Sequence, residues 1–413
     1  MARKMKDSGI EWIGEIPEGW EVVPVKRLCT MQAGKNLTSE QIAPEGTYPV
    51  YGGNGIRGYF SDYNCDGQFL TVGRQGALCG NVHKINGKIW ATEHAVITTP
   101  SSYTILDFLY YLLIGMDLNQ YISSTAAQPG LAVGTLLNLK TCYPCSTLEQ
   151  TQISNYLNAK CTEIDTMLSK TRSSIEEYKK LKQAVITQAV TKGVRGEREM
   201  KDSGVKWIGE IPKEWVIQKI KSISSRINVG VVIRPSEYFD ENGTVPFLRG
   251  INVKEYLISS DNMVYINESS NRILSKSQVH TDDILIVRDG SIGTSCVVPA
   301  EFDGANVVSM VIATPSISCD SRFICYSLNS DVGKTQFTLT KIGSALTHTS
   351  VSAVSDIIIA VPSCAEQKEI ADYLDAKCVE IDGLIAKKEQ LVKELESYKK
   401  SLIYEVVTGK REV

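Results

Sequence analysis

Two arginines follow strand-like runs and stand just before a glycine, in the pattern of a tight turn. The runs are LTVGRQG, which contains Arg74, and LIVRDG, which contains Arg288. Gly76 and Gly290 occupy the same place after these two arginines. An arginine at such a turn can present its planar guanidinium group to a guanine edge or to a phosphate. The alternative is a structural turn in which the arginine pairs with a nearby carboxylate.

Further basic and amide side chains near glycine-rich turns are candidates for contacts to nucleic acid. Each of them, taken alone, is also typical of a solvent-exposed surface charge. In the first half of the chain the other candidates are Lys35, Asn54, Arg57, Gln75, Lys84 and Lys88. In the second half they are Arg234, Arg249, Asn252, Arg272, Lys276 and Lys341.

Patterns that would indicate catalysis or metal binding are weak. CYPC at 142–145 stands before an expected helix, where a helix dipole would stabilise a thiolate. The matching residues 360–363 read AVPS, which favours a turn into a helix over redox chemistry, and no second cysteine pair completes a zinc site. GKT at 333–335 lacks the first glycine of a phosphate-binding loop. His83, His94, His280 and His348 show no paired ligand spacing, so the sequence indicates a binding protein without catalytic or metal residues.

The composition is that of a soluble globular protein with room for two or three domains. Of 413 residues, 43% are hydrophobic and 22% are charged, and no stretch approaches the ~18 consecutive apolar residues of a membrane span. Eleven cysteines without a dense framework fit reduced thiols, so we expect a cytoplasmic protein. The net charge of −3 means that binding to nucleic acid would depend on local patches.

The chain contains one unit twice. MKDSGIEWIGEIP at 5–17 recurs as MKDSGVKWIGEIP at 200–212, and YLNAKCTEID at 156–165 recurs as YLDAKCVEID at 373–382. The second copy is about twenty residues longer between these landmarks. The repeat is much longer than the ~20–50 residues of a solenoid, so it indicates duplication of a whole domain with its helix.

Residues 146–193 and 363–413 predict two long helices. Each begins with a capping-box pattern after a proline, Ser146-x-x-Glu149 and Ser363-x-x-Glu366, and each ends near a glycine. Their apolar residues repeat every 3.5 residues, as in a coiled coil, whereas packing of each helix on its own domain would need a broader stripe. Lys182 and Lys399 interrupt the stripe at equivalent positions and are expected to fix its register. The predicted seam residues are Leu157, Ile164, Leu168, Ile175, Tyr178, Val185, Leu374, Ile381, Ile385, Val392, Leu395 and Leu402.

The predicted fold class is therefore α+β. Two globular mixed α/β domains, 1–145 and 194–362, are joined by two long antiparallel coiled-coil helices in a pseudo-twofold internal duplication. Short helices are also expected over 104–115 and 320–329.

The repeated segments resemble those of a known family. DSGIEWIGEIPEGWEVVPVKRL and DSGVKWIGEIPKEWVIQKI are similar to the opening of specificity subunits of type I restriction–modification systems. The segments YPCSTLEQTQISNYLNAKCTEID and VPSCAEQKEIADYLDAKCVEID resemble the ends of their domains. The resemblance covers the whole chain.

This resemblance implies a DNA-binding subunit without catalytic activity or a cofactor of its own. Two target-recognition domains would each read one half of a bipartite, asymmetric site in double-stranded DNA. The helices would set the gap between the half-sites and dock two methyltransferase subunits, which use S-adenosylmethionine to methylate adenine. Restriction translocase subunits would then join, and no membrane is involved. Base-contacting residues lie in divergent loops of the family, so only Arg74 and Arg288 rest on a motif shared by both halves.

Three alternatives remain open at this point. A duplicated coiled-coil adaptor would have no role on DNA. A redox enzyme would depend on Cys142 and Cys145. A specificity subunit of a modification-only system would lack the restriction partner.

Overall fold

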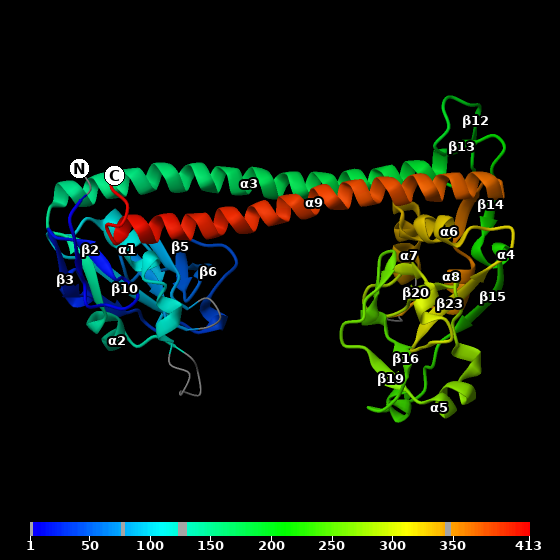
Figure 1. Ribbon diagram of the computed structural model, residues 1–413, viewed down its shortest axis with the longest axis horizontal. Coiled ribbons are helices and arrows are strands. Elements are labelled where there is room, and N and C mark those ends of the chain that lie inside the picture. Colours follow the sequence, from blue (N-terminus) through cyan, green and yellow to red (C-terminus); the bar gives the residue numbers. More distant parts are fainter. Residues whose placement is uncertain (1–2, 76–78, 123–129, 343–347) are drawn as a thin grey trace. The chain divides into compact units, whose positions relative to one another are not determined.

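The computed structural model describes residues 3–75, 79–122, 130–342 and 348–413, with only the backbone for 340–342. The chain forms two compact units. Unit 1 comprises Met1–Arg172 and Glu389–Val413, and unit 2 comprises Ser173–Lys388. Helices α3 (Thr147–Lys192) and α9 (Cys364–Val407) contribute to both units and lie side by side (Figure 1). The fold class predicted from the sequence is confirmed.

Unit 1 is built on a four-stranded antiparallel sheet of order β4-β10-β7-β8. A three-stranded sheet of order β6-β5-β9 packs nearby, and two-stranded pairs join β1 to β2 and β3 to β11. The strands are β1 (Met5–Asp7), β2 (Glu15–Pro17), β3 (Trp20–Pro24), β4 (Cys29–Ala33), β5 (Tyr48–Gly52), β6 (Gly55–Phe60), β7 (Gln68–Gly73), β8 (Val82–Asn86), β9 (Trp90–Ala91), β10 (Ala95–Pro100) and β11 (Lys140–Pro144). The helices are α1 (Leu106–Gly115) and α2 (Val133–Asn138).

Unit 2 repeats these sheets. Its four-stranded sheet has the order β15-β23-β20-β21, its three-stranded sheet the order β19-β16-β22, and β12–β13 and β14–β24 form the pairs. The strands are β12 (Met200–Asp202), β13 (Glu210–Pro212), β14 (Val216–Lys219), β15 (Ser224–Val229), β16 (Val245–Leu248), β17 (Val253–Lys254), β18 (Leu257–Ile258), β19 (Val264–Ile266), β20 (Ile284–Val287), β21 (Ser295–Val297), β22 (Asn306–Val307), β23 (Met310–Pro315) and β24 (Ile358–Val361). The helices are α4 (Ile220–Ile223), α5 (Glu268–Ile273), α6 (Ser321–Asn329), α7 (Asp331–Ile342) and α8 (Val351–Ser355).

The extra length of the second copy is confined to one connection. Residues 53–67 lie between β5 and β7 of unit 1, whereas 249–283 lie between the matching strands β16 and β20 of unit 2. The longer connection adds the β17–β18 hairpin and helix α5. The insertion therefore extends one edge of the unit and leaves the order of the main sheet unchanged.

The two hydrophobic cores use equivalent residues. Trp20, Phe108 and Leu157 are fully buried in the core of unit 1. Trp215, Phe323 and Leu374 take the same places in the core of unit 2. Phe108 and Phe323 come from α1 and α6, which confirms the short helices expected from the sequence.

A buried tryptophan fastens the start of α3 to the sheets of unit 1. The Trp20 side chain is 1% exposed, and its indole Nε1–H donates to Glu149 Oε1 at 3.0 Å. The Arg3 guanidinium lies over the same indole, 5.7 Å from the ring centre, and pairs with the Glu149 carboxylate. One carboxylate in the first turn of the helix thus joins residues on both sides of the repeated opening 5–17.

Unit 2 contains the same arrangement at the start of α9. Trp215 Nε1–H donates to Glu366 Oε2 at 3.2 Å, and Arg198 lies 5.3 Å from the ring centre. Arg198 Nη2 is 2.7 Å from Glu366 Oε1, and the Glu366 side chain is only 6% exposed. We call each set of three residues an Arg–Trp–Glu cluster.

These clusters modify the capping boxes expected from the sequence. The backbone N–H groups of Glu149 and Glu366 reach Ser146 Oγ and Ser363 Oγ, each at 3.4 Å. The glutamate carboxylates turn to tryptophan and arginine, so among the described residues only the serine half of each box forms. A carboxylate in the first helical turn also interacts favourably with the helix dipole.

The glutamine that follows each glutamate completes the attachment. Gln150 Nε2 donates to Pro144 O, and Gln367 Nε2 donates to Pro362 O, both at 3.0 Å. Gln150 Oε1 accepts from the backbone of Ile105 at 2.8 Å, just before α1, and Gln367 Oε1 makes the matching bond before α6 at 3.0 Å. Both amides are buried, so the Glu-Gln pair links the helix start to the last strand and to the short core helix.

Within each unit α3 and α9 run antiparallel along an apolar seam. Lys399 Nζ lies 2.7 Å from Asp165 in unit 1, and Lys182 Nζ lies 2.7 Å from Asp382 in unit 2. These two lysines are among the polar residues that interrupt the seam in the sequence, as Thr171 and Lys388 also do, and each of the two pairs across to the other helix. The buried seam residues are Leu157, Ile164, Leu168, Ile175, Leu374, Ile381 and Leu402, and the half-buried ones are Tyr178, Val185, Ile385, Val392 and Leu395.

Replacement of Glu366 by alanine should destabilise the protein by about 3 kcal/mol, because Trp215 and Arg198 would lose their shared buried acceptor. Urea-induced unfolding measures the change. The matched control is Glu369→Ala on the same helix, where an exposed ion pair contributes about 1 kcal/mol or less. Equal effects of the two substitutions would contradict a stabilising role for the cluster.

The substitution Lys182→Asp should lower the free energy of unfolding by about 1 kcal/mol, because it places two carboxylates together across the helix pair. Adding Asp382→Lys should recover most of that loss. A double-mutant cycle from urea unfolding gives the coupling energy. Lys160 and Glu163, which pair along α3 only, serve as the control cycle. A coupling no larger than in the control would refute the cross-helix contribution.

Candidate nucleic-acid interface

In unit 1, polar turns from distant parts of the sequence meet at the end of β7. The backbone N–H of Arg74 donates to His94 O at 3.0 Å, which joins this end to the turn between β9 and β10. Gly73 lies so close to the β5–β6 turn that a Cβ atom on it would come within 1.8 Å of Gly53 O. Asn81 Nδ2 donates to Asn54 Oδ1 at 2.7 Å. We call residues 52–55, 73–75, 81–83 and 92–94 junction 1.

Several buried polar atoms of junction 1 have no hydrogen-bond partner among the described residues. They are Arg74 Nε, His83 Nε2, Thr92 Oγ1, Glu93 Oε2 and His94 Nδ1. His94 Nε2 lies 3.1 Å from Glu93 Oε1. Each of these two side chains therefore has one polar atom in contact with the other residue and one without a partner. Burial lowers the pKa of His83, which leaves its imidazole neutral near pH 7. Buried polar groups are normally paired, so the cluster suits a polar ligand that brings donors and acceptors of its own.

The equivalent place in unit 2 is the turn after β20. The Arg288 Nε–H donates to Thr349 O at 2.9 Å, and the Thr349 N–H donates to Arg288 O at 3.1 Å. Asp289 is exposed and accepts from Ser309 Oγ at 3.3 Å. Beside it opens a cleft of about 610 Å³ between this turn and residues 249–255. We call residues 249–255, 288–294 and 309 junction 2.

The backbone of each shared arginine bonds to a later segment, and only in Arg288 does the side chain also bond to that segment. The Leu131 N–H donates to Arg74 O at 2.9 Å, as Thr349 does to Arg288. Among the described residues neither arginine pairs with a carboxylate, so the simple ion-paired turn considered from the sequence is absent. The motif thus holds the strand end against a later segment. Gly76, the glycine that follows Arg74, lies outside the described residues.

The other sequence candidates are scattered. Lys84 lies against α1, with Nζ 2.8 Å from Asp107 and 4.5 Å from the Tyr110 ring centre. Lys88 lies over Tyr63, and Arg234 pairs with Glu237 at 3.1 Å. The side chain of Lys341 is outside the described part of the chain. Lys35, Asn54, Arg57, Arg272 and Lys276 are exposed, whereas Arg249 and Gln75 are half-buried at the junctions.

Asn252 is a correction to the sequence analysis. Its side chain is fully buried, and Nδ2 donates to Ser259 O at 3.1 Å and to Asp261 O at 2.8 Å. Its Oδ1 accepts from the backbone of Arg249 at 3.1 Å. The amide therefore holds a loop together and does not face a ligand.

Sequence reasoning missed the partners that complete the junctions. Asn81, Glu93 and Ser309 carry no motif, and each reaches its junction only through strand pairing or a turn after it. The spacing of His83 and His94 in the sequence indicates no paired site, and only the fold brings both to junction 1. One feature of the sequence points to Asp289 as a candidate, which is that it directly follows Arg288.

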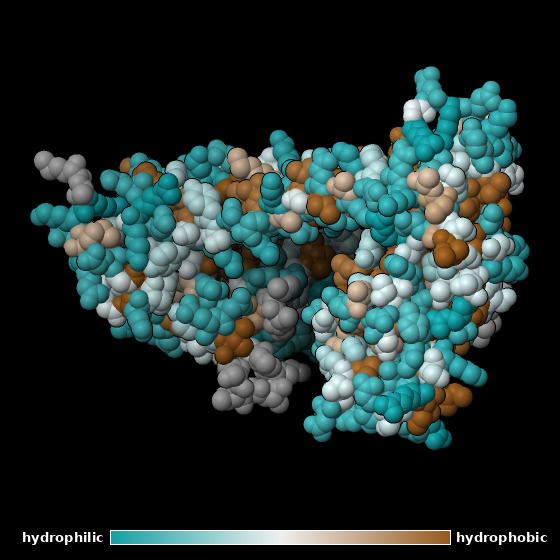
Figure 2. Space-filling model, turned by 45° about the vertical axis from the view of Figure 1, so that its right-hand side comes forward, coloured by the Kyte–Doolittle hydropathy of each residue, from teal (hydrophilic) through white to brown (hydrophobic). Residues whose placement is uncertain are grey.

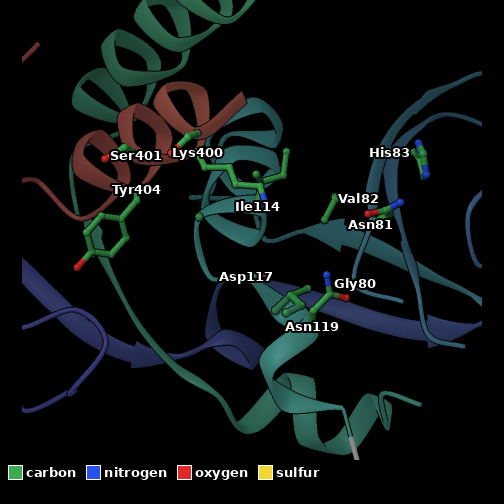
Figure 3. Close-up of a pocket in the computed structure, with 13 residues that line it drawn as sticks. Gly80, Asn81, Val82, His83, Ile114, Asp117, Asn119, Lys400, Ser401 and Tyr404 are labelled. Carbon is green, nitrogen blue, oxygen red and sulfur yellow. The ribbon is translucent and has the colours of Figure 1, made fainter. Parts of the chain in front are cut away.

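A hollow in unit 1 lies between the start of β8, the end of α1 and α9. It has a volume of about 620 Å³, and Asn81 and His83 line it from one side and Lys400 and Ser401 from another (Figure 3). Its largest polar side chain, Tyr404, donates to Trp12 O at 2.8 Å. This hydrogen bond fastens α9 to the repeated opening.

Hydropathy alone does not mark an interface. Hydrophilic residues cover most of the visible surface, with apolar residues scattered among them (Figure 2). Within residues 3–75, 79–122, 130–342 and 348–413, no helix combines the length and apolar character of a membrane span. The same residues bring no three potential metal ligands together.

Both halves of the duplicated chain match the model of one known protein family. Residues 17–177 and 212–395 match the model of the type I restriction modification DNA specificity domain, once in each half of the chain. The chain belongs to this specificity-subunit family. It is therefore a non-catalytic DNA specificity subunit of a type I restriction–modification system.

Related specificity subunits support this assignment. The MjaVIII specificity subunit of Methanocaldococcus jannaschii is 24% identical over 417 residues, which cover 96% of this chain and 93% of that one. The EcoprrI specificity subunit of Escherichia coli is 45% identical over 121 residues, which span 28% of this chain and 30% of that one. A chain from a structure on complex assembly and conformational transition of the type I R-M system shares the fold, with a TM-score of 0.72 at 13% identity over 96% of this chain and 99% of that one.

The cysteine pair of the specificity subunit is structural. Cys142 is fully buried on β11, and burial raises the pKa of its thiol to about 12. Its Sγ lies 3.8 Å from Val407 O in the last turn of α9. Burial also raises the pKa of Cys145. Raised thiol pKa values oppose the thiolate that redox chemistry requires.

Iodoacetamide at pH 8 should alkylate exposed Cys145 and spare Cys142, because the thiolate of Cys142 forms only as the pH approaches 12. Peptide mass spectrometry after timed labelling measures both sites. In urea the two cysteines should react at similar rates. Equal labelling of Cys142 and Cys145 in the folded protein would contradict the buried, protonated thiol.

Proposed function

We propose that the chain reads a bipartite, asymmetric site in double-stranded DNA, with one half-site for each unit. The main support is the pair of junctions, which occupy the same place in two copies of one fold but carry different polar side chains. Equivalent sheets present the two surfaces, and the side chains on them differ. This combination suits a site whose two halves have different sequences. The scattered candidates Lys35, Arg57, Lys88, Arg234, Arg272 and Lys276 then serve as phosphate contacts around the junctions.

The two long helices set the gap between the half-sites in this proposal. α3 and α9 are continuous, and their seam is closed by apolar residues and by the lysine–aspartate pairs. A continuous helix rises 1.5 Å per residue and so acts as a ruler whose length is set by the sequence.

Two methyltransferase subunits dock on the helices and supply adenine methylation with S-adenosylmethionine, and restriction subunits join through them. The support is apolar surface outside the seam at equivalent positions of the repeat. Leu181 is 48% exposed in unit 2, and Tyr398 is 48% exposed in unit 1. Exposed large apolar side chains at matching positions suit two copies of one partner. A cytoplasmic location belongs to the same proposal, because the eleven cysteines are all free.

Co-expression with the methyltransferase subunit in a host free of adenine methylation tests the proposal. Single-molecule sequencing should show methyladenine in one asymmetric motif with a fixed gap. A variant with seven residues added to both helices, after Arg172 and after Glu389, should widen the gap by about 3 base pairs and keep both half-sites, because the helices lengthen by about 10 Å.

The control is the same heptad added to α9 alone, which should disrupt the seam and abolish methylation. Absence of any motif while both subunits are soluble and associated would favour the adaptor without a DNA role. A widened gap together with altered half-sites would refute the helices as a ruler.

A further inference from the structure

The two junctions differ systematically in the chemistry of the side chains on their shared turns. The turn after β5 carries Asn54, and the segment after the matching strand β16 begins with Arg249, which takes the place of Gly52 in the strand register. The residue after the shared arginine is Gln75 in unit 1 and Asp289 in unit 2. Junction 1 thus presents two amides, and junction 2 presents a guanidinium and a carboxylate.

The amides of junction 1 are placed for contact. Asn54 is exposed, and Asn81 Nδ2 donates to its Oδ1, which orients the amide and leaves Oδ1 a second lone pair. Gln75 follows the anchored Arg74, and its backbone bridges to Gly130. The two amides therefore extend from backbone that is held on both sides.

The charged pair of junction 2 lines one cleft. Arg249 and Asp289 both border the 610 Å³ hollow. Arg249 Nη2 donates to Asn262 O, while its Nε is buried without a hydrogen-bond partner among the described residues. Asp289 is exposed and bonded to Ser309. A buried, unpartnered donor beside an exposed carboxylate suits a ligand that supplies an acceptor and a donor.

In the major groove of DNA, these two sets of side chains pair with different bases. Asparagine and glutamine pair with N6 and N7 of adenine. Arginine pairs with O6 and N7 of guanine, and a carboxylate accepts from N4 of cytosine. The partners of Arg249 and Asp289 are thus the two members of one G·C pair.

We infer that unit 2 reads a G·C pair with Arg249 and Asp289, and that unit 1 reads adenines of A·T pairs with Asn54 and Gln75. The inference rests on the proposed function and adds the residues that determine each half-site. Arg74 and Arg288 stand at the same place in the two units, and a later segment bonds to the backbone of each, so the shared arginine does not by itself account for a difference between the halves. Arg288, whose Nε–H also donates to Thr349 O, is a positioning residue.

Transplanting the side-chain set of junction 1 into junction 2 tests the inference. In the co-expressed complex, Arg249→Asn with Asp289→Gln should reduce the preference for one G·C pair in one half-site by roughly 10- to 100-fold, since a good base contact is worth about 1–3 kcal/mol. The other half-site and the gap should be unchanged. The reciprocal variant, Asn54→Arg with Gln75→Asp, should alter an A·T pair in the other half-site only.

Lys213→Gln with Glu199→Gln is the matched control, because it removes one exposed cation and one exposed anion from unit 2 far along the chain from junction 2. It should leave the motif intact. Co-purification of each variant with the methyltransferase shows that the variant is folded. If a folded variant does not methylate, competition binding with duplexes changed at each base pair gives the same preference directly.

An unchanged motif in the folded junction 2 variant would overturn the inference, as would a wild-type motif without a G·C pair in the half-site that this variant affects. Both results leave the bipartite reading intact. A wild-type complex without any bipartite motif would instead overturn the proposed function itself.

Discussion

The hydrogen bond from a buried indole to a glutamate in the first turn of a long helix is the contact on which each unit depends. Trp20 and Trp215 occupy the centres of the two cores, and Glu149 and Glu366 are the residues that connect these cores to α3 and α9. The arginine over each indole stands two residues before the repeated opening. The Glu366 carboxylate is buried and the Glu149 carboxylate is half-buried, so each is favourable only while its tryptophan and arginine donors are present, and the short opening and the helix start therefore occur together, twice.

A second constraint acts along the helices. A narrow apolar seam holds α3 against α9 but does not by itself select one register among those related by a heptad. The lysine–aspartate pairs add that selection, because Lys182 and Lys399 reach their carboxylates in one alignment only. Register in turn decides the length of helix between the two helix starts, so the charge pairs connect packing to the proposed spacing of the DNA half-sites.

In each unit, the residues that form the shared framework are different from the residues that are proposed to contact DNA. Sheet order, core residues and the backbone-anchored arginines are common to both units, whereas Asn54, Gln75, Arg249 and Asp289 differ. The insertion at 249–283 supplies one wall of the cleft in unit 2 without disturbing its main sheet. A duplicated fold can therefore change what it binds by changing a few turn residues, since these contribute little to the cores.

The sequence by itself determined the duplication, the two long helices with their seam, and the α+β class. Repeats and a 3.5-residue apolar period can be read from the order of residues alone. The sequence also placed Arg74 and Arg288 on equivalent turns. Only the tertiary structure decided that Asn252 is buried, that Lys84 faces α1, that Asn81 bonds to Asn54, and that Arg74 bonds to His94. Those contacts come from strands paired across long stretches of chain, and neither composition nor spacing along the sequence encodes which turns such pairing brings together.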